Sequence, residues 1–360
     1  MAEMTMRERM IAVIQGKEYD RVPFVQYHNV AAPYTEIWAR IGRENLGLLR
    51  WCYVHQWDSG ACRIEEAPIA RRGLKGLRRV LHTPDGELWE ERLFEPTYGT
   101  GHIESHFVKE PKDYKVLLAY LRSVTVRKNT QLVEEAIREY GDAGLPHVSM
   151  GRTPYQQLWV EWVSLEDLCL HMADEPELVE EVMTALAAIQ RRHFEIACQV
   201  VRELPVYHIN IGDNITAPII GPAHFRRYCV PQYDLLAEML DLTGKDIPVF
   251  VHMDGDLKPL WDDIAACRVR GLDSFSPPPD NDTPVADAVR LWPRMRLWVN
   301  FPSSVHLRPP REVYEQAMRI LTEGGHTGRL QIQVSENVPP GVWQNSFPQI
   351  VRAIHDFGRP

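Results

Sequence analysis

The sequence lacks the long apolar runs and the paired cysteines that mark two large classes of protein. No uninterrupted apolar stretch of 18 residues occurs in the 360, which argues against a membrane-spanning helix, and no apolar leader is recognisable. Its six cysteines are scattered without a CxxC pair, so we interpret them as reduced core thiols. These absences predict a cytoplasmic protein with no membrane partner.

An excess of positive charge is also missing. The chain carries 40 Lys and Arg against 49 Asp and Glu, which gives a formal net charge of -9. Such a chain repels phosphates, so we expect no nucleic-acid partner. The densest basic segment, residues 71–79, we interpret as a solvated loop. Apolar residues make up 44% of the chain, which is enough material for a large core.

Glycine-rich phosphate loops do not open any of the expected helices, which removes the main argument for a dinucleotide-binding fold. Short apolar segments instead alternate with amphipathic ones. The segments that predict strands are 22–27, 146–151, 206–211, 249–251, 272–275, 297–299 and 330–334. The segments that predict helices are 176–201, 225–243, 259–268, 285–291, 311–323 and 347–357.

Repeated strand–helix units require parallel strand pairing with right-handed crossovers. We therefore predict an α/β fold, a (β/α)8 TIM barrel that forms one domain over residues 1–360. A doubly wound open sheet is the alternative.

The first 140 residues fit this alternation less well. Thr5-Met6-Arg7-Glu8 is a capping box that opens a helix, and residues 35–57 and 109–140 predict further helices. Residues 79–108 alternate apolar and polar around Pro84-Asp85-Gly86, which is typical of a β-hairpin. We expect an N-terminal helical part with an antiparallel insertion at 79–108, which could form the interface of a homodimer.

The most informative segment is residues 248–255, where an apolar run leads into His252, Asp254 and Gly255. This pattern predicts a buried strand that ends in a loop. His252 and Asp254 are two residues apart, so their side chains point to the same side of a strand. An imidazole and a carboxylate placed in this way can bind a metal ion, although an Asp after a strand can also cap a helix.

In a parallel barrel the functional residues gather at the carboxyl ends of the strands. The polar residues that follow the predicted strands are His28, Asn29, His147, Arg152, Asp213, Asn214, His252, Asp254, Asn300, Ser335, Glu336 and Asn337. Ligands from several strands would converge there, as a metal site requires. Asp213 can equally be a helix cap, whereas Glu336 caps poorly and is more plausible as a ligand.

Several motifs resemble the uroporphyrinogen decarboxylase superfamily. They are Met6-Arg7-Glu8-Arg9, Gly16-Lys17-Glu18-Tyr19-Asp20-Arg21-Val22-Pro23, Asp213 with Pro222-Ala223-His224-Phe225-Arg226-Arg227-Tyr228 and Pro231, His252-Met253-Asp254-Gly255, and Val338-Pro339-Pro340 with Asn345. The resemblance spans nearly the whole chain. It implies a (β/α)8 barrel with one of two activities, which are tetrapyrrole decarboxylation and zinc-dependent methyl transfer that involves a corrinoid.

The decarboxylase branch of that superfamily carries an Arg-Gln-Ala-Gly-Arg motif after its first strand, which holds substrate carboxylates. Residues 26–33 stand at this place and contain no arginine. A tetrapyrrole with many carboxylates would need an arginine clamp. This difference argues against tetrapyrrole decarboxylation.

The thiol-alkylating methyltransferases of the superfamily use His-x-Cys-Gly and a later Gly-Cys as zinc ligands. Here His252 is kept, but Asp254 and Glu336 stand in the places of the two cysteines. Carboxylates donate less charge than thiolates, which would leave a bound zinc more electrophilic. Such a metal suits a departing ether oxygen better than a thiol.

The resemblance therefore implies a zinc-dependent methyltransferase that moves a methyl group from a small, aromatic methyl ether to a corrinoid on a partner protein, as in the O-demethylase methyltransferases of anaerobes. His252, Asp254 and Glu336 would bind the zinc. The predicted catalytic residues are Asp213, as a fourth ligand or an orienting carboxylate, and His28. The predicted substrate contacts are Tyr27, Tyr155, Asn300 and Phe301.

Two other functions remain open from the sequence. One is a metal-free decarboxylase of a small acid, in which Asp213 or His28 would donate the proton. The other is a non-catalytic barrel that binds a corrinoid or a porphyrin for delivery.

Overall fold

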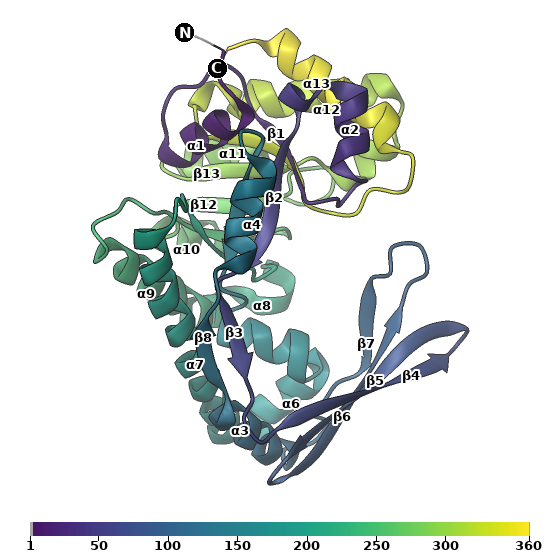
Figure 1. Cartoon of the computed structure of the whole chain (residues 1–360), viewed down its shortest axis with the longest axis vertical. Helices are drawn as coiled ribbons and strands as arrows, with labels where there is room; N and C mark the ends of the chain where they lie inside the picture. Colours follow the sequence, from purple (N-terminus) through teal and green to yellow (C-terminus); the bar gives the residue numbers. More distant parts are fainter. Residues whose placement is uncertain (1–2, 360) are drawn as a thin grey trace. The chain divides into compact units, whose positions relative to one another are not determined.

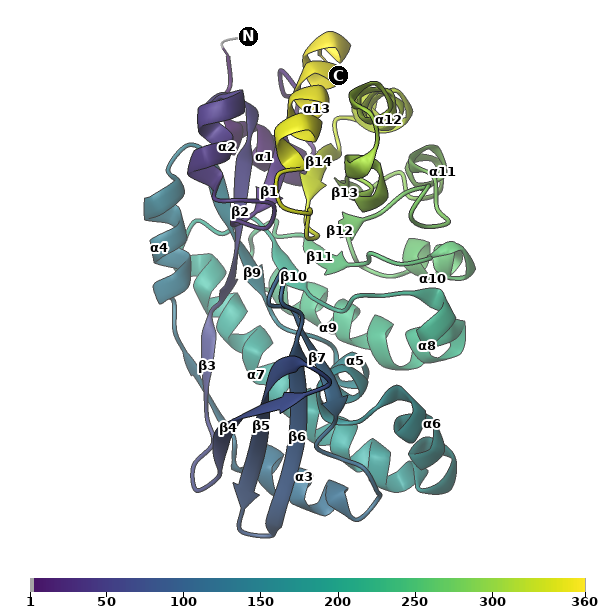
Figure 2. The same ribbon diagram turned by 90° about the vertical axis from the view of Figure 1, so that its right-hand side faces the viewer.

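Eight parallel strands close into a barrel in this computed structural model, which describes residues 3–359. Around the barrel they follow the order β1, β14, β13, β12, β11, β10, β9, β2 (Figure 1 and Figure 2). Their bounds are Phe24–Tyr27 (β1), Gly47–Tyr53 (β2), Gly144–Ser149 (β9), Ile209–Ile211 (β10), Val249–His252 (β11), Gly271–Phe275 (β12), Arg296–Asn300 (β13) and Leu330–Val334 (β14). The predicted (β/α)8 barrel is confirmed.

Packing divides the chain into two compact units. Unit 1 contains Met1–Val54, Thr130–Gly151 and Ala197–Pro360, and it includes the whole barrel. Unit 2 contains His55–Asn129 and Arg152–Ile196. The single domain over residues 1–360 stays a prediction, because units defined by packing need not fold independently.

Helices of unit 1 alternate with the barrel strands along the chain, beginning with α1 before β1. They are α1 (Met6–Gln15), α2 (Tyr34–Ile41), α4 (Gln131–Tyr140), α8 (Ala217–His224), α9 (Val230–Asp241), α10 (Trp261–Ala266), α11 (Val285–Leu291), α12 (Pro310–Gly324) and α13 (Trp343–Phe357). The predicted capping box opens α1, since the Thr5 hydroxyl accepts from the Glu8 N–H and the Glu8 carboxylate accepts from the Thr5 N–H.

Unit 2 is built from two small antiparallel sheets and helices. β3 (His55–Asp58) pairs with β8 (Thr125–Lys128), and a four-stranded sheet contains β4 (Arg63–Arg71), β5 (Leu74–Thr83), β6 (Gly86–Phe94) and β7 (Gly101–Ser105). Its helices are α3 (Asp113–Ser123), α5 (Pro154–Gln157), α6 (Leu165–Asp174) and most of α7 (Pro176–Glu203). The turn expected at Pro84-Asp85-Gly86 joins β5 to β6, but the antiparallel sheet begins well before residue 79.

Two helix predictions near the N-terminus were correct only in part. Residues 35–57 contain α2, which ends before Gly42 at φ 88°, and then the strands β2 and β3. Residues 109–140 contain α3 and α4 with β8 between them. β2 contains Trp51 and Tyr53, which favour strands, but its residues do not alternate between apolar and polar, and hydrogen bonds to β1 and β9 hold it in the barrel.

The barrel interior is polar where branched apolar side chains are usual. Tyr27 on β1 and His147 on β9 both contact Asp273 on β12, and neither strand is a neighbour of β12. These contacts therefore cross the interior. Other fully buried polar residues on the barrel strands include Asn210, Gln331 and Gln333. So much buried polarity indicates a binding or catalytic site within the barrel.

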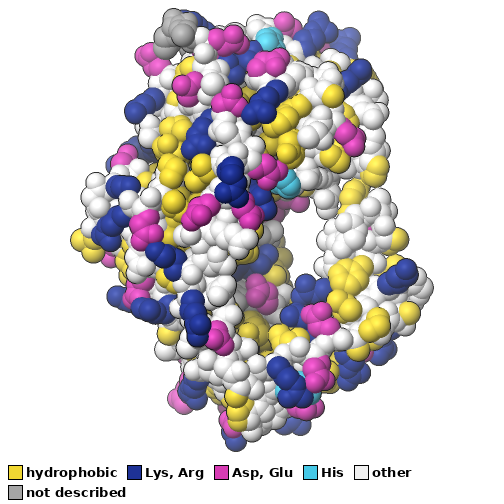
Figure 3. All heavy atoms as spheres, viewed as in Figure 1, with side chains coloured by type: hydrophobic (Ala, Val, Ile, Leu, Met, Phe, Trp, Pro, Cys, Tyr) yellow, Lys and Arg dark blue, Asp and Glu magenta, His cyan; other side chains and the backbone are white. Residues whose placement is uncertain are grey.

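Charged side chains of both signs are mixed over the face in Figure 3. Among residues 3–359, no helix combines the length and the apolar character that crossing a bilayer requires.

Candidate metal centre

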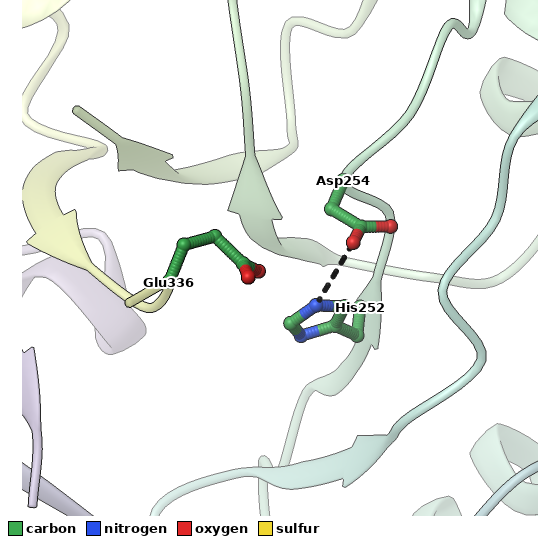
Figure 4. A group of neighbouring side chains, drawn as sticks. All are labelled: His252, Asp254 and Glu336. Atoms are coloured by element: carbon green, nitrogen blue, oxygen red, sulfur yellow. Dashed lines mark ion pairs between the residues drawn. The ribbon is translucent and has the colours of Figure 1, made fainter. Parts of the chain in front are cut away.

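His252, Asp254 and Glu336 lie together at the carboxyl ends of the barrel strands (Figure 4). His252 is the last residue of β11, Asp254 lies in the loop after it, and Glu336 follows β14. One ligand atom from each lies within 4.8 Å of the other two. Because β12 and β13 separate β11 from β14, closure of the barrel is what brings these predicted ligands together.

The imidazole of His252 is held from one side by Asp273. Its Nδ1 lies 2.9 Å from Asp273 Oδ2, while its Nε2 lies 3.7 Å from Asp254 Oδ2. Figure 4 shows the Glu336 carboxylate turned toward the same ring. Asp273 therefore orients the ring and leaves Nε2 facing the two other carboxylates, an arrangement common at metal-binding histidines.

Asp273 is in turn fixed by residues from other strands. The Tyr27 hydroxyl donates to its Oδ2 at 2.5 Å, Gln333 Nε2 donates to its Oδ1 at 2.9 Å, and His147 Nε2 lies 3.3 Å from Oδ2. Burial by itself would raise the pKa of Asp273, but His147 and His252 hold that pKa well below its usual range. Asp273 is thus a buried carboxylate anion.

Sequence reasoning missed Asp273. The available signal was a carboxylate inside the apolar strand segment 272–275, where a charge is costly unless it is paired. Tyr27 and His147 were noticed at strand ends, but their common partner could not be found by following single strands.

Negative charge accumulates around His252. Burial opposes protonation of the imidazole, yet hydrogen bonds and charges from Asp254 and Asp273 raise the pKa of His252 to about 10. Burial raises the pKa of Glu336, and repulsion from Asp254 and Asp273 adds to the increase while His252 opposes it. Three carboxylates thus share one imidazole. The negative charge of the three carboxylates exceeds what one imidazolium can balance, and a divalent cation would balance it. The imidazole nitrogen and the carboxylate oxygens are donor atoms that such a cation binds.

Asp213 does not belong to this three-residue group. It is fully buried, and its Oδ2 accepts a hydrogen bond at 2.5 Å from the Tyr233 hydroxyl on α9. It does not directly precede α8, whose N-cap is Thr216. Burial raises the pKa of Tyr233 well above its usual range, and the Asp213 carboxylate reinforces that increase. The catalytic role of Asp213 stays a prediction.

His28 lies among other aromatic side chains after β1. Its ring centroid is 5.5 Å from that of Tyr34 and 5.8 Å from that of Tyr140, and its Nδ1 is hydrogen-bonded to the Tyr140 hydroxyl. Partial burial lowers the pKa of His28, which favours the neutral ring. The structure does not include it in the metal group, and its catalytic role also stays a prediction.

Asn300 ties together the ends of three strands. Its Oδ1 accepts from the Ser335 N–H at 3.0 Å and from the Ser335 hydroxyl at 2.9 Å, and its Nδ2 donates to Ser276 Oγ at 3.2 Å. The next residue, Phe301, is fully buried with its ring 4.9 Å from that of His306. Tyr155, on α5, is buried in unit 2. Their predicted contacts with a substrate are untested.

The fold and the cluster define a (β/α)8-barrel protein with a candidate metal centre at the carboxyl ends of its strands. A family model described as Uroporphyrinogen decarboxylase (URO-D) matches residues 162–357, more than half of the chain. The chain belongs to the uroporphyrinogen decarboxylase family, and the resemblance seen in its sequence motifs is confirmed.

Solved structures give a fold comparison. A methyltransferase from Methanosarcina mazei is 15% identical and superposes with a TM-score of 0.58, covering 99% of this chain and 99% of that chain. A B12-independent methionine synthase from Shewanella sp. W3-18-1, in complex with selenomethionine, is 11% identical with a TM-score of 0.43, covering 74% and 73%. A comparison with curated proteins finds no match.

Proposed function

We propose that this protein is a zinc-dependent methyltransferase that takes a methyl group from a small aromatic methyl ether and passes it to a corrinoid on a partner protein. The observation that carries the proposal is the group formed by His252, Asp254 and Glu336, whose ligand atoms lie within 4.8 Å of one another. The shared fold with a methyltransferase supports it.

The donor set fits zinc, which binds imidazole nitrogen and carboxylate oxygen at about 2.0–2.2 Å. His252 would bind through Nε2, and Asp254 and Glu336 through one oxygen each. When bound, zinc supplies Lewis acidity to an ether oxygen. Asp273 keeps the His252 ring in the required orientation, because it occupies Nδ1.

An aromatic wall stands beside His252. Trp51 on β2 is partly exposed, and its ring centroid is 6.1 Å from that of His252, 4.8 Å from that of His147 and 5.6 Å from that of Tyr27. Gly212 leaves room for this indole, since a Cβ at that position would lie 3.1 Å from the ring. A flat phenyl ether would pack on such a surface.

Metal analysis of purified protein tests the proposed centre. We expect about one zinc ion per chain in the wild type and a loss of zinc in His252→Ala and Glu336→Gln, because each variant removes one ligand. His102→Ala is the matched control, since His102 is exposed on β7 in unit 2. Zinc retained by His252→Ala at the wild-type level would contradict the assignment.

Turnover tests the proposed reaction. We expect the protein to demethylate methoxybenzenes or methoxybenzoates with free cob(I)alamin as acceptor, forming methylcobalamin and the phenol. Chelation should abolish the spectral change and zinc should restore it. Release of CO₂ from a small acid, unaffected by chelation and without methylcobalamin, would favour the decarboxylase instead. Binding of cobalamin without turnover of any methyl ether would favour the delivery function.

A further inference from the structure

Unit 2 holds a cavity of about 720 Å³ whose lining residues all belong to that unit. Cavities that bind small molecules have volumes of about 300–1,000 Å³. Its walls come from the four-stranded sheet and the residues that follow β7, from β3 and α3, and from the segment that runs from Arg152, just before α5, to the start of α6. None of the residues of the candidate metal centre lines it.

One wall of the cavity is aromatic. Trp57, Phe107, Trp159 and Trp162 all line it. The Trp162 ring centroid lies 5.4 Å from that of Phe107 and 5.5 Å from that of Tyr120, so this indole is fixed by its neighbours. Rigid aromatic faces of this kind pack well against a planar ring.

The same wall contains a single π-helical turn, Leu158–Trp162. The N–H of Val163 donates to the carbonyl of Leu158, five residues earlier, at 3.0 Å. Such turns are rare and occur frequently at functional sites. This turn supplies Trp159, Glu161 and Trp162 to the cavity.

Three arginines give the cavity its charge. Arg79, Arg92 and Arg152 line it, and Glu161 is the one carboxylate among its lining residues. Arg152 Nη1 lies 3.3 Å from Glu161 Oε1, and Arg92 Nη2 lies 3.3 Å from Glu90 Oε1. Arg79 pairs with Glu90 and with Glu66, which do not line the cavity. The lining residues therefore carry a positive excess.

Three donors on these lining residues are unsatisfied. Nε of Arg92, Nε of Arg152 and Nε1 of Trp162 are buried and have no hydrogen-bond partner among residues 3–359. Trp162 is only 6% exposed, so its N–H has little access to solvent. Buried donors normally find an acceptor, so three unpaired donors on the residues that line one cavity call for a partner that residues 3–359 do not supply.

Gly101 on β7 helps to place one of these donors. A Cβ at this position would lie 2.9 Å from the Arg92 side chain, so the absence of a side chain lets Arg92 pass close to the β7 backbone. The guanidinium group itself is held at Nη2, which lies 3.3 Å from Glu90 Oε1.

We propose that this cavity binds a planar aromatic carboxylate. The carboxylate would accept hydrogen bonds from the free N–H groups of Arg92, Arg152 and Trp162, and the ring would lie among the indoles of the wall. Charge-assisted bonds to guanidinium groups are the stronger kind of hydrogen bond. The inference does not rest on the proposed methyl transfer, since no metal ligand takes part.

Titration of the full-length protein with benzoate tests this site, followed by calorimetry and by tryptophan fluorescence. We expect saturable binding at millimolar concentration or tighter. Cyclohexanecarboxylate, benzyl alcohol and inorganic phosphate each lack the aromatic ring, the carboxylate or both, and each should bind at least tenfold more weakly. Phosphate binding as tight as that of benzoate would overturn the proposal in favour of a simple anion patch.

Two variants test whether Arg152 and Trp162 donate hydrogen bonds to the bound carboxylate. Arg152→Gln and Trp162→Phe should each weaken benzoate binding roughly tenfold or more, because each removes a donor to a charged group. Trp162→Phe keeps an aromatic ring in the wall, so weaker benzoate binding by this variant would not be explained by unfolding. The control is Arg122→Gln, since Arg122 is exposed in unit 2 and paired with Glu181.

Comparison with the metal centre separates this inference from the proposed function. His252→Ala should leave the benzoate Kd unchanged, because all the lining residues belong to unit 2. Absence of benzoate binding, or equal binding by wild type, Arg152→Gln and Trp162→Phe, would overturn the proposed site whether or not the protein binds zinc.

Discussion

Asp273 is the residue on which the geometry of the candidate metal centre most depends. It receives hydrogen bonds from Tyr27 and Gln333, and it contacts the Nδ1 of His252. An anion held this firmly favours one tautomer and one ring orientation of the histidine. Its contribution can be separated from direct metal binding, because it is not one of the three proposed ligands.

Replacement of Asp273 by Asn should therefore weaken zinc binding without removing a ligand. We expect the zinc affinity to fall by roughly 10–100-fold, as is typical when the partner of a metal-binding histidine is lost. Competition with a chromogenic chelator measures it. Asp280→Asn is the matched control, since Asp280 is bonded to Ser304 outside the cluster. An unchanged zinc affinity in Asp273→Asn would show that the ring needs no such support.

The raised pKa of His252 leads to a pH dependence of metal binding. In the metal-free protein this pKa is about 10, so at neutral pH a proton must leave the ring before zinc can bind. Lower pH favours the proton and higher pH favours the metal. We expect the apparent zinc affinity to rise by about tenfold per pH unit between pH 6 and pH 8. Calorimetry in buffers of different ionisation enthalpy would detect the released proton, and a Kd that does not change with pH would refute the interpretation.

At the scale of elements, the loops after β10 and β11 are packed together behind the metal ligands. The Ile215 N–H donates to the His252 carbonyl at 3.3 Å, and the Gly255 N–H donates to the Ile215 carbonyl at 3.1 Å. A Cβ at position 255 would lie 2.2 Å from the Thr216 Cβ and 2.9 Å from its Cα. The loop that carries Asp254 therefore needs glycine at this position.

Replacement of Gly255 by Ala should disturb both stability and metal binding. We expect a loss of about 1–3 kcal/mol in the free energy of unfolding, because the added methyl forces the two loops apart. Zinc affinity should also fall, since Asp254 is the adjacent residue. Urea unfolding of the metal-free protein and zinc titration measure the two effects. In the control Gly244→Ala, which has open space at φ +76°, only stability should fall, by about 1–2 kcal/mol.

At the scale of the whole molecule, the metal centre connects strands that are far apart in the chain. Its ligands stand at the ends of β11 and β14, and Asp273, which orients one of them, lies on β12. Unfolding separates these groups, so a cation that binds all three ligands binds the native barrel preferentially. Metal binding is therefore coupled to the stability of the barrel.

Zinc should consequently stabilise the protein against unfolding. At a free zinc concentration of about 100 times Kd, the expected gain is about 2.7 kcal/mol, and the melting temperature should rise by several degrees. Differential scanning calorimetry with zinc and with chelator measures the shift. If the two units unfold in separate transitions, only that of the barrel unit should move. The same shift in His252→Ala would show that zinc acts elsewhere.

Much of the architecture could be predicted from local patterns. The apolar segments that became β11, β12, β13 and β14 were found within a residue or two, and the capping box at Thr5 opens α1. β2 and β8 were missed although they contain Trp, Tyr, Thr and Val, which favour strands. Neither segment alternates clearly between apolar and polar residues, and both are held by partners distant in the chain.

The candidate site divides in the same way. His252 and Asp254 could be paired from the sequence, because strand geometry places residues two apart on one side. Glu336 could be added to them because of its position in a family motif. Asp273 could not be linked to Tyr27, His147 and Gln333, because only the closed barrel brings these residues together. The cavity of unit 2 likewise combines side chains from strands, a helix and a π-helical turn.

The sequence by itself determined that this protein is a parallel barrel of the uroporphyrinogen decarboxylase family, because periodicity and motifs are properties of neighbouring residues. Only the tertiary structure decided which polar groups meet inside the barrel and which donors stay unpaired in unit 2. These contacts join residues that are far apart in the sequence and form only when the sheets close, so no local sequence pattern predicts them.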